Sequence, residues 1–461
     1  MGNGSWTPDL HKDAGPLYLA IADALARDIA AGTLKGGERL PPQRQLAARL
    51  GIDFTTVSRA YTEARRRGLV DGRVGRGTYV RTRRPDPGSR TAGGPVDMSM
   101  NNPPGFDDAA LTDRMAGTMA ALLEETGSNL LLRYQEPGGA PSDRAMGCAW
   151  LTPRLPHLTP DTVLICPGAQ GALLALVSLL ARPGDTVCAE AFAYPGFRAL
   201  AAHLGLAVTG IAMDDQGLVP DAFEAACRAQ KPKLLYCNPT LHNPTTSTLP
   251  PDRRSAIVAI ARSHGVPIIE DDAYGALPKN PVPPLAAHAP DLVYHIAGLA
   301  KCLAPALRIA YLAVPDRSAA ARVSSAIRAT AGMASPLAAA IASRWIDDGT
   351  AARALDAIRL ESARRQEVVR SVLPPDSVVT DPEAFHVWLH MPAAWTRGEF
   401  AARLRAAGIG VVVSDAFSVD APIEAVRLGL GAPGSCEALR QSLQIAADLL
   451  ADSPALSSAI V

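Results

Sequence analysis

Short apolar runs alternate with helical patterns rich in Ala and Leu over most of the chain from Asp97 onward. Such runs are typical of strands buried on both faces, as in a parallel sheet covered by helices on each side. The alternation therefore predicts a mostly parallel α/β sheet. After about residue 316 the pattern is mainly helical, and Ala384–His390 and Gly408–Val413 suit a small C-terminal α/β lobe. The predicted strands of the main sheet are Val163–Cys166, Thr186–Ala189, Leu234–Cys237, Val266–Glu270, Leu292–Ile296 and Ile309–Val314.

The composition changes along the chain and indicates three zones. Residues 16–80 contain amphipathic helices and a hairpin punctuated by glycine. Residues 81–96 hold Pro, Gly and Arg without periodicity, which is typical of a linker. We predict domains at residues 14–81 and 97–455, joined by a linker at residues 82–96.

Charge is distributed unevenly, although the formal net charge of the chain is zero. Residues 1–90 carry 16 Lys and Arg against 9 Asp and Glu, and the rest of the chain carries the matching acidic excess. A basic first part favours a polyanionic partner for that part alone. Single arginines are most often solvated surface charges, and we interpret Arg65–Arg67 in that way.

The seven cysteines are scattered along the chain, odd in number and without Cys-x-x-Cys spacing. This pattern suggests neither a disulfide framework nor a zinc site, so we expect no metal and a reducing compartment. The first residues lack the apolar core of a signal peptide, and no apolar run is long enough to span a membrane. We therefore expect a cytoplasmic protein without a membrane partner.

The N-terminal zone has the spacing of a helix-turn-helix followed by a wing. Apolar residues over Tyr18–Ile29 recur at helical spacing. A short helix follows within Leu40–Gly51 and ends at its glycine, and Asp53 suits the N-cap of a helix over Phe54–Arg67. Alternation and glycines over Leu69–Val80 are typical of a two-stranded wing. Two short helices joined by a tight turn place the second one in a DNA major groove.

The segment from Tyr18 to Val80 resembles the winged helix-turn-helix of the GntR family. The matching blocks are Leu40-Pro-Pro-x-Arg44-x-Leu-Ala, Thr56-Val-x-Arg59-Ala-Tyr and Gly75-Arg76-Gly77-Thr-Tyr, in that order. The resemblance implies a domain that binds double-stranded DNA. It implies that the residues at or near the DNA are Arg44, Thr55, Thr56, Arg59, Arg76 and Gly77.

Lys301 lies among small apolar residues in the segment Gly298–Arg308. A lysine in such surroundings loses solvation, which lowers its pKa towards imine chemistry. Asp271 comes at the end of an earlier predicted strand, at the edge where α/β sheets bind ligands. A carboxylate buried there needs a cationic partner, and a pyridinium nitrogen is one. Arg308 follows Lys301 by seven residues, which is a short reach for a phosphate contact.

Further residues suit the other parts of pyridoxal 5'-phosphate (PLP), a cofactor that needs an amine, a carboxylate and a phosphate cradle. Tyr274 and Asn243 suit hydrogen bonds to the ring hydroxyl, and Tyr194 suits stacking on the ring. Gly168-Ala169-Gln170 follows a predicted strand and begins a helix, so its amides suit the phosphate. Each feature alone has a simpler explanation, as a common turn, a common helix cap or an ordinary core residue.

Taken in order, these residues resemble the fold-type I aminotransferases from about Asp97 to about Leu450. The resemblance implies PLP bound to Lys301 as a Schiff base. It implies that Tyr134, in Arg133-Tyr134-Gln-Glu-Pro-Gly-Gly, reaches the phosphate across a dimer interface. It also implies that Arg427 pairs with the α-carboxylate of a substrate or effector through a bidentate contact.

The chain departs from the aminotransferase pattern around the lysine and in one turn. The family usually has hydroxyl residues three before and one before the lysine, where this chain has Gly298 and Ala300. The family's Asn-Pro-Thr-Gly turn ends here in Thr246. Losing phosphate hydroxyls should weaken cofactor affinity without removing the imine chemistry.

A GntR-type domain, a linker and an aminotransferase-like domain in this order resemble the MocR subfamily of bacterial transcription regulators. The resemblance implies a PLP-dependent regulator that senses a small amino compound, binds an operator at the nucleoid and forms a head-to-tail homodimer. Two alternatives stay open: a working aminotransferase with an accessory DNA-binding domain, and a domain that no longer binds PLP. The presence of Lys301, Asp271 and Asn243 disfavours the second.

Overall fold

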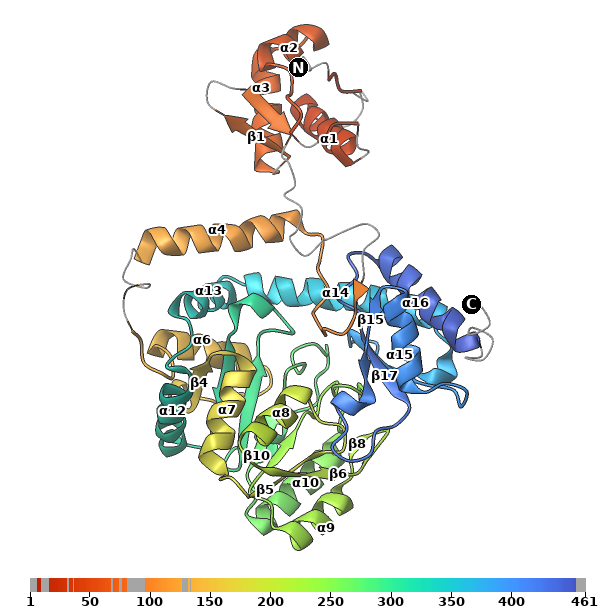
Figure 1. Ribbon diagram of the computed structural model, residues 1–461. Helices are drawn as coiled ribbons and strands as arrows, with labels where there is room; N and C mark the ends of the chain where they lie inside the picture. Colours follow the sequence, from red (N-terminus) through yellow and green to blue (C-terminus); the bar gives the residue numbers. More distant parts are fainter. Residues whose placement is uncertain are drawn as a thin grey trace. The chain divides into compact units, whose positions relative to one another are not determined.

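The computed structural model describes residues 6–9, 16–30, 33–35, 37–67, 69–73, 77–80, 96–126, 132 and 134–452. It divides into two compact units (Figure 1). The N-terminal unit comprises the described part of Met1–Ala92 with Asp108–Arg114, and the larger unit comprises the described part of Gly93–Asp107 and Met115–Val461. The predicted linker lies outside the described residues except for Val96.

The described residues of the N-terminal unit up to Val80 form three helices and a two-stranded antiparallel wing, as predicted, and the unit also contains the first residues of α4 (Ala109–Thr126). The helices are α1 (Leu17–Ala30), α2 (Gln43–Leu50) and α3 (Phe54–Arg66), and the wing is β1 (Val70–Arg73) with β2 (Gly77–Val80). The apolar faces of the helices and wing form one core, because burying these side chains is the main force that holds so small a unit together. Its members include Ile21, Leu25, Leu46, Val57, Tyr61 and Val80.

The predicted turn between α2 and α3 is confirmed at both of its ends. Gly51 adopts a left-handed φ of 64° and its N–H returns to the last turn of α2, a conformation that glycine adopts without the steric cost of a Cβ. The carboxylate of Asp53 accepts a hydrogen bond of 2.7 Å from the backbone N–H of Thr55, which caps α3.

The larger unit contains a seven-stranded sheet in the order β4-β12-β11-β10-β9-β5-β6. β12 runs in the direction opposite to that of the other six strands of this sheet, which are parallel to one another, so the predicted mostly parallel sheet is confirmed. All six predicted runs are strands, and the edge strand β6 was not predicted. The strands are β4 (Val163–Cys166), β5 (Thr186–Glu190), β6 (Ala207–Ile211), β9 (Leu235–Cys237), β10 (Ile268–Asp271), β11 (Val293–Gly298) and β12 (Ala310–Ala313).

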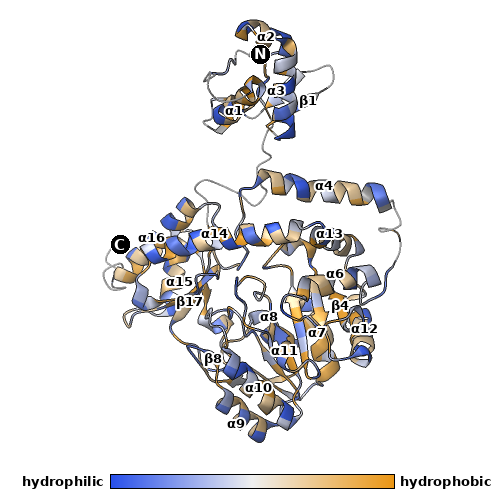
Figure 2. Cartoon of the chain, turned by 180° about the vertical axis from the view of Figure 1, so that it is seen from behind, coloured by the Kyte–Doolittle hydropathy of each residue, from blue (hydrophilic) through white to orange (hydrophobic). Residues whose placement is uncertain are grey.

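Helices cover both faces of this sheet. One apolar core joins it to α7 (Gly168–Leu180), α8 (Pro195–His203) and α12 (Arg317–Ala331). A second core joins the opposite face to α9 (Pro220–Gln230), α10 (Pro251–His264) and α11 (Leu285–His288). Figure 2 shows α7 as predominantly hydrophobic, as expected for a helix that the sheet and other helices enclose.

The predicted small lobe is an antiparallel sheet in the order β13-β14-β17-β16, with α15 packed beside it and α16 packed on α14. Its members are β13 (Val378–Val379), β14 (His386–His390), β16 (Val412–Val413), β17 (Ala425–Gly429), α14 (Thr350–Val372), α15 (Arg397–Ala406) and α16 (Cys436–Ala451).

Other elements are β3 (Val96–Asp97) paired with β15 (Ile409–Gly410), β7 (Met213–Asp214) paired with β8 (Gly217–Leu218), α4 (Ala109–Thr126), α6 (Pro141–Leu151) and α13 (Pro336–Asp347). Among the described residues, no helix combines the length and the apolar composition needed to cross a bilayer.

Candidate functional site

The predicted cofactor residues converge at one edge of the seven-stranded sheet. β10 ends at Asp271, and its parallel neighbour β11 ends at Gly298, three residues before Lys301. α7 begins at Gly168, directly after β4. The carboxyl ends of parallel strands share one edge of a sheet, which is where α/β folds bind ligands.

Lys301 is partly buried, and its amine donates a hydrogen bond to the backbone carbonyl of Asn101. Burial lowers the pKa of Lys301 to about 8, and the positive charges of Arg427 and Arg308 lower it too, against the opposing effect of Asp271. A much larger fraction of this amine is therefore neutral near neutral pH than of an exposed lysine. A neutral amine is the nucleophilic form of lysine.

Asp271 has one carboxylate oxygen that lacks a partner. The hydroxyl of Tyr236 donates to Oδ2 at 2.8 Å, whereas Oδ1 is buried without a hydrogen bond among the described residues. Burial raises the pKa of Asp271 to about 6. Buried polar atoms are nearly always satisfied, so this oxygen fits a donor that a ligand brings. A protonated pyridine nitrogen is such a donor and carries the cationic charge that a buried carboxylate requires.

Arg308 lies against the first turn of α7. Gly168 has a left-handed φ of 74°, and a Cβ at this position would lie only 3.1 Å from Nη2 of Arg308. The first amides of a helix have no partners inside the helix, and the helix dipole makes this end positive. Ala169 and Gln170 belong to the same turn. This arrangement of free amides beside a guanidinium fits a phosphate.

Tyr194 precedes α8, and its ring packs over the backbone of Gly196, where a Cβ would lie 2.3 Å from Cε1 of the ring. Tyr194 is 36% exposed, and the burial of the rest of its side chain raises its pKa; the charge of Asp271 raises it further, whereas Arg308 and Arg427 lower it. Tyr194 is therefore electrostatically coupled to the charged groups of the candidate cofactor position. Its stacking on a cofactor ring stays a prediction.

Arg427 and Asn243 are brought together, although they are far apart in the sequence. One guanidinium nitrogen of Arg427 donates to Oδ1 of Asn243 at 2.9 Å, and the other donates to the backbone carbonyl of Ser99. The remaining nitrogen, Nε, is buried without a partner among the described residues. The guanidinium lies over the ring of Phe417, 5.2 Å from its centroid. Arg427 therefore has unused hydrogen-bonding capacity for an anionic group.

The segment Met98–Asn102, which we call the strap, was not predicted to contribute to the site. Its Ser99 carbonyl binds Arg427, and its Asn101 carbonyl binds Lys301. The side-chain amide of Asn101 also donates to the hydroxyl of Tyr274 at 2.8 Å. A backbone carbonyl is present at every residue, so no pattern in the sequence marks this segment.

Close backbone contacts hold the strap against the small lobe. The N–H of Gly429 in β17 donates to the carbonyl of Met98 at 2.8 Å. A Cβ at Gly431 would lie 1.9 Å from the carbonyl oxygen of Asn102, so that only glycine allows this approach. The strap continues β3, which pairs with β15 of the lobe.

Tyr236 in the neighbouring strand β9 and Asn238 directly after it support Asp271, and neither was predicted as a site residue. The side-chain amide of Asn238 donates to the backbone carbonyl of Asp271 at 2.5 Å, and the N–H of Asn238 donates to Glu190 at 2.8 Å. The ring of Tyr236 stacks on Phe197 with centroids 3.9 Å apart, which fixes the direction of its hydroxyl. These contacts come from tertiary packing and leave no local signal.

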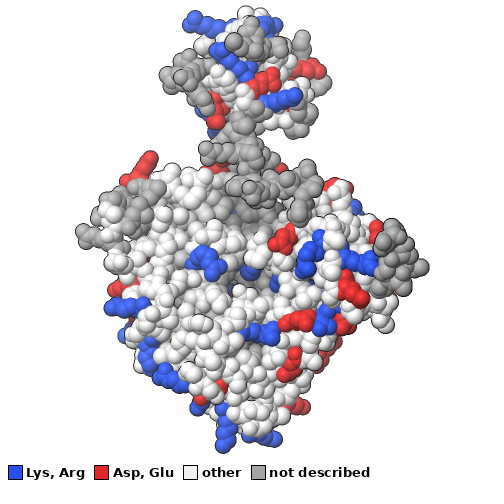
Figure 3. Space-filling view, viewed as in Figure 1, with Lys and Arg blue, Asp and Glu red and all other residues white. Residues whose placement is uncertain are grey.

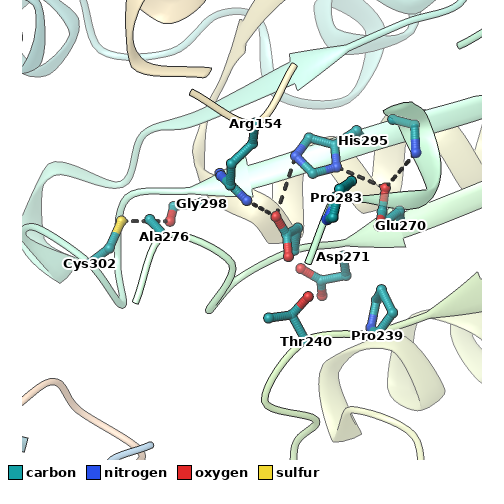
Figure 4. Close-up of polar contacts among 12 residues, drawn as sticks. Arg154, Pro239, Thr240, Glu270, Asp271, Ala276, Pro283, His295, Gly298 and Cys302 are labelled. Carbon is teal, nitrogen blue, oxygen red and sulfur yellow. Dashed lines mark hydrogen bonds and ion pairs between the residues drawn. The ribbon is translucent and has the colours of Figure 1, made fainter. Parts of the chain in front are cut away.

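Behind Asp271 lies a buried ionic network (Figure 4). Side chains alternate along a strand, so Glu270 points away from Asp271. Its Oε2 accepts a hydrogen bond of 2.9 Å from Nδ1 of His295, and the guanidinium of Arg154 donates to Asp272. All of these side chains are almost fully buried. The run of three acids at the end of an apolar strand was the sequence signal for this network.

Opposing effects set the charges inside the network. Burial would raise the pKa of Glu270, but the hydrogen bond from His295 and the nearby charge of Arg254 outweigh it and hold that pKa below its ordinary value. Burial lowers the pKa of His295. The hydrogen bond to Glu270 places a proton on Nδ1 of His295, since a carboxylate can only accept.

Other predicted residues lie outside the cluster or differ from the aminotransferase pattern. Tyr134 is 95% exposed, so it is not brought to Lys301 within one chain. A Cβ at Gly298 would lie 3.6 Å from the Cβ of Ala169, which is an ordinary van der Waals contact. Steric crowding therefore does not explain the glycine at this position. Thr246 adopts a left-handed φ of 61° at the turn position where the family has glycine.

The predicted DNA contacts have varied surroundings. The hydroxyl of Thr55 binds the Asp53 carboxylate, and the guanidinium of Arg59 lies over the ring of Tyr18, 4.5 Å from its centroid. Thr56 is half-buried on α3, and Gly77 begins β2 with a φ of 106°. The guanidinium of Arg44 lies over the ring of Phe54. Arg76 lies outside the described residues.

Comparisons with known proteins agree with this architecture. Residues 94–444 match the family of class I and II aminotransferases, and residues 17–80 match the gntR family of bacterial regulatory proteins. The chain is 31% identical to the uncharacterized HTH-type transcriptional regulator YdeF of Bacillus subtilis over 97% of both proteins. It is 27% identical to the vitamin B6 salvage pathway transcriptional repressor PtsJ of Salmonella typhimurium, over 89% of this chain and 93% of that protein.

A solved structure extends the comparison to the fold of the larger unit. LysN, an α-aminoadipate aminotransferase from Thermus thermophilus, matches with a TM-score of 0.70 and 21% identity, over 78% of this chain and 92% of LysN. At this identity the likeness shows the fold alone. Residues 17–80 match one family and residues 94–444 the other, and the likeness to YdeF spans both regions; the chain therefore belongs to the MocR subfamily of GntR-family transcription regulators, in which a winged helix-turn-helix is joined to an aminotransferase-like domain.

Proposed function

We propose that this protein is a PLP-dependent transcription regulator. Its N-terminal unit binds a double-stranded DNA operator, and its larger unit senses a small amino compound at Lys301. The observation that carries the proposal is a partly buried lysine beside an incompletely satisfied Asp271, in the same chain as a GntR-type domain. Such a regulator acts at the nucleoid in the cytoplasm.

The residues around Lys301 fit each part of the cofactor. When bound, PLP supplies an aldehyde that reacts reversibly with primary amines. Lys301 provides the amine of the protein, and Oδ1 of Asp271 accepts the hydrogen bond of the ring nitrogen. Arg308 and the first amides of α7, from Gly168 to Gln170, bind the phosphate. Tyr274, Tyr194 and Asn243 orient the ring.

Two contacts of the strap suggest how an effector is sensed. Arg427 would bind the carboxylate of an amino acid, and in the structure it binds the carbonyl of Ser99. Lys301 would bind the cofactor, and in the structure it binds the carbonyl of Asn101. A carboxylate binds a guanidinium through two charged oxygens, which is stronger than one neutral carbonyl. Effector binding therefore releases Ser99 from Arg427.

The strap connects this release to the reader through the chain itself. Residues 81–95 lie between Val80 of the wing and Val96 of the strand that leads into the strap. A ligand shifts a conformational equilibrium only through contacts that differ between two states. The contact between the Ser99 carbonyl and Arg427 differs in this way, because it is present without the effector and broken when the effector is bound.

A head-to-tail homodimer completes the proposal. Tyr134 is almost fully exposed on one chain, together with the neighbouring Leu132. An aromatic residue and a leucine that are both exposed, two positions apart in the sequence, suit burial against a second copy. In the dimer, Tyr134 of each protomer reaches the phosphate site of the other. Two readers then bind a repeated half-site.

DNA binding tests the proposal. The full chain should bind the promoter region beside its gene, and its affinity should fall by on the order of 10³-fold between about 50 and 200 mM salt if six or more phosphates are contacted. A chain that begins at Asp97 should show no binding, because it lacks the basic first part. Fluorescence anisotropy titrations of labelled duplexes at both salt concentrations measure this.

The truncated chain needs its own control for folding. It should take up PLP and absorb visible light like the full chain, since the cofactor residues follow Asp97. Equal DNA affinity of the truncated and full chains would show that the N-terminal unit is not the reader.

Arg427→Met should abolish the spectral response to amino acids and retain the response to amines without a carboxylate. The substitution keeps most of the side-chain volume but removes the group that pairs with the carboxylate. Absorption titrations with L-alanine and with ethylamine, on the PLP-loaded full chain, separate the two responses. Arg198→Met is the matched control, because Arg198 also donates to backbone carbonyls, those of Asp415 and Ala416. If Arg427→Met responds to L-alanine like the unsubstituted protein, Arg427 is not the carboxylate site.

An aminotransferase with an accessory reader is the second candidate. It is favoured by the coexistence of Lys301, whose pKa is lowered to about 8, and Arg427, since both groups serve a transamination half-reaction. Release of a keto acid from an added amino acid, at more than one equivalent per chain with a second keto acid present, distinguishes turnover from sensing.

A further inference from the structure

The N-terminal unit has a surface hollow of about 330 Å³. It lies where the segment before α2, the first residues of α2 and α3 and the start of β2 meet. The lining includes Arg39, Leu40, Arg44, Phe54, Gly77 and Thr78. In a winged helix-turn-helix, the N-terminal end of the second helix meets base edges in the major groove. The hollow therefore opens at the part of the unit that would face DNA.

Phe54 occupies this end of α3 and is 43% exposed. It is absent from the core of the unit, to which Val57 and Tyr61 of the same helix belong. The guanidinium of Arg44 lies over its ring, 5.8 Å from the centroid. A single exposed apolar residue is common on protein surfaces. Phe54 is distinguished by its position, since it is the first residue of the helix that reads DNA.

Two arginines of the hollow lack acidic partners. Among the described residues, neither Arg39 nor Arg44 forms an ion pair, whereas Arg66 of α3 and the following Arg67 are paired with Glu63. Arg39 lies on the wing at Gly77, where a Cβ would be 2.9 Å from its Nε. An aromatic ring beside two unpaired guanidiniums is complementary to DNA, which offers both apolar and anionic groups.

We infer that this hollow is a DNA-docking site in which Phe54 packs on the methyl group of a thymine while Arg39 and Arg44 bind the adjacent phosphates. Among the four bases, only thymine presents a methyl group in the major groove. A phenyl ring has no hydrogen-bonding group, so it selects thymine by apolar contact alone. The inference rests on the proposed DNA binding, and adds to it a base preference and the residue that imposes it.

Replacing single thymines by deoxyuridine tests the contact, because this change removes the methyl group and leaves the hydrogen-bonding edges intact. A preferred duplex is first selected from a random-sequence library with the full-length protein. Each thymine is then replaced in turn, and affinity is measured by anisotropy. At one thymine of each half-site the loss should be about fourfold, the effect of burying one methyl group.

Three variants assign the effect to residues. Phe54→Ala should bind the thymine and deoxyuridine duplexes equally. Leu17→Ala is the matched control, since Leu17 is similarly exposed at 40% but lies at the start of α1, and it should retain the fourfold difference. Arg39→Ala should retain the difference too and reduce the slope of log affinity against log salt by about one.

The outcomes separate this inference from the proposed function. Sequence-specific binding without any thymine-methyl effect, or a methyl effect that survives in Phe54→Ala, overturns the inference and leaves the proposed function standing. Failure of the full chain to bind any duplex overturns both. Loss of the methyl effect in Phe54→Ala, with an unchanged circular dichroism spectrum and an unaffected Leu17→Ala control, supports the contact.

Discussion

Lys301→Ala should leave the protein colourless after incubation with PLP, whereas the unsubstituted protein should be yellow. Within the described site, Lys301 is the amine that lies beside both Asp271 and Arg427. Its removal therefore eliminates the covalent link and not merely one of several contacts. Absorption spectra recorded after gel filtration, which removes free cofactor, measure the loss of the visible band.

Lys301→Arg is the control for charge. A guanidinium can still donate to the Asn101 carbonyl, which Lys301 binds in the structure, but it cannot form the covalent link. This variant should be folded and colourless. A visible band in Lys301→Arg would move the covalent link to another lysine, and a colourless unsubstituted protein would contradict the cofactor assignment itself.

The pH dependence of cofactor uptake follows from the same lysine. Burial lowers the pKa of Lys301 to about 8, so the neutral amine accumulates as the pH rises through that value. The initial rate of PLP uptake by the cofactor-free protein should rise about tenfold per pH unit below 8 and level off above it. With an exposed lysine of ordinary pKa, ~10.4, the uptake rate would continue to rise for about two further pH units. Stopped-flow absorption from pH 6 to 10 measures the profile.

Arg154→Met should destabilise the larger unit by about 3–5 kcal/mol, the usual result of removing one partner of a buried ion pair. The side chains of Arg154 and Asp272 are 7% and 1% exposed, so solvent cannot replace the lost guanidinium. Oδ1 of Asp272 already lacks a partner among the described residues. Urea unfolding followed by tryptophan fluorescence gives the change in the free energy of unfolding.

The double variant Arg154→Met/Asp272→Asn distinguishes an unpaired charge from lost packing. Removing the carboxylate charge should recover much of the stability, because the unpaired anion is the main cost in the single variant. If the double variant is as unstable as the single one, packing of the arginine stem dominates. If the free energies of unfolding of Arg154→Met and the unsubstituted protein differ by less than ~1 kcal/mol, the pair contributes little to stability.

The sequence by itself determined the local structure of both units. Apolar runs located six of the seven strands of the main sheet, because burial on both faces requires continuous apolar residues. Asp53 and Gly51 fixed the helix ends through short-range hydrogen bonds and a left-handed φ. Motif order predicted the family, which the comparisons confirm. The strand β6 was missed because it lies at the sheet edge and is only partly buried.

Only the tertiary structure decided which groups meet around Lys301. Asn101 precedes Lys301 by 200 residues and Ser99 precedes Arg427 by 328, and both contacts use backbone carbonyls. The Oδ1 of Asp271 is left unsatisfied only because packing directs the Tyr236 hydroxyl to Oδ2. A sequence encodes such contacts through the whole fold, since a carbonyl has the same chemistry at every residue and its partner depends on where the chain passes. Residue types could therefore predict the chemistry of the site, whereas the groups that contact the site residues could be identified only from the folded chain.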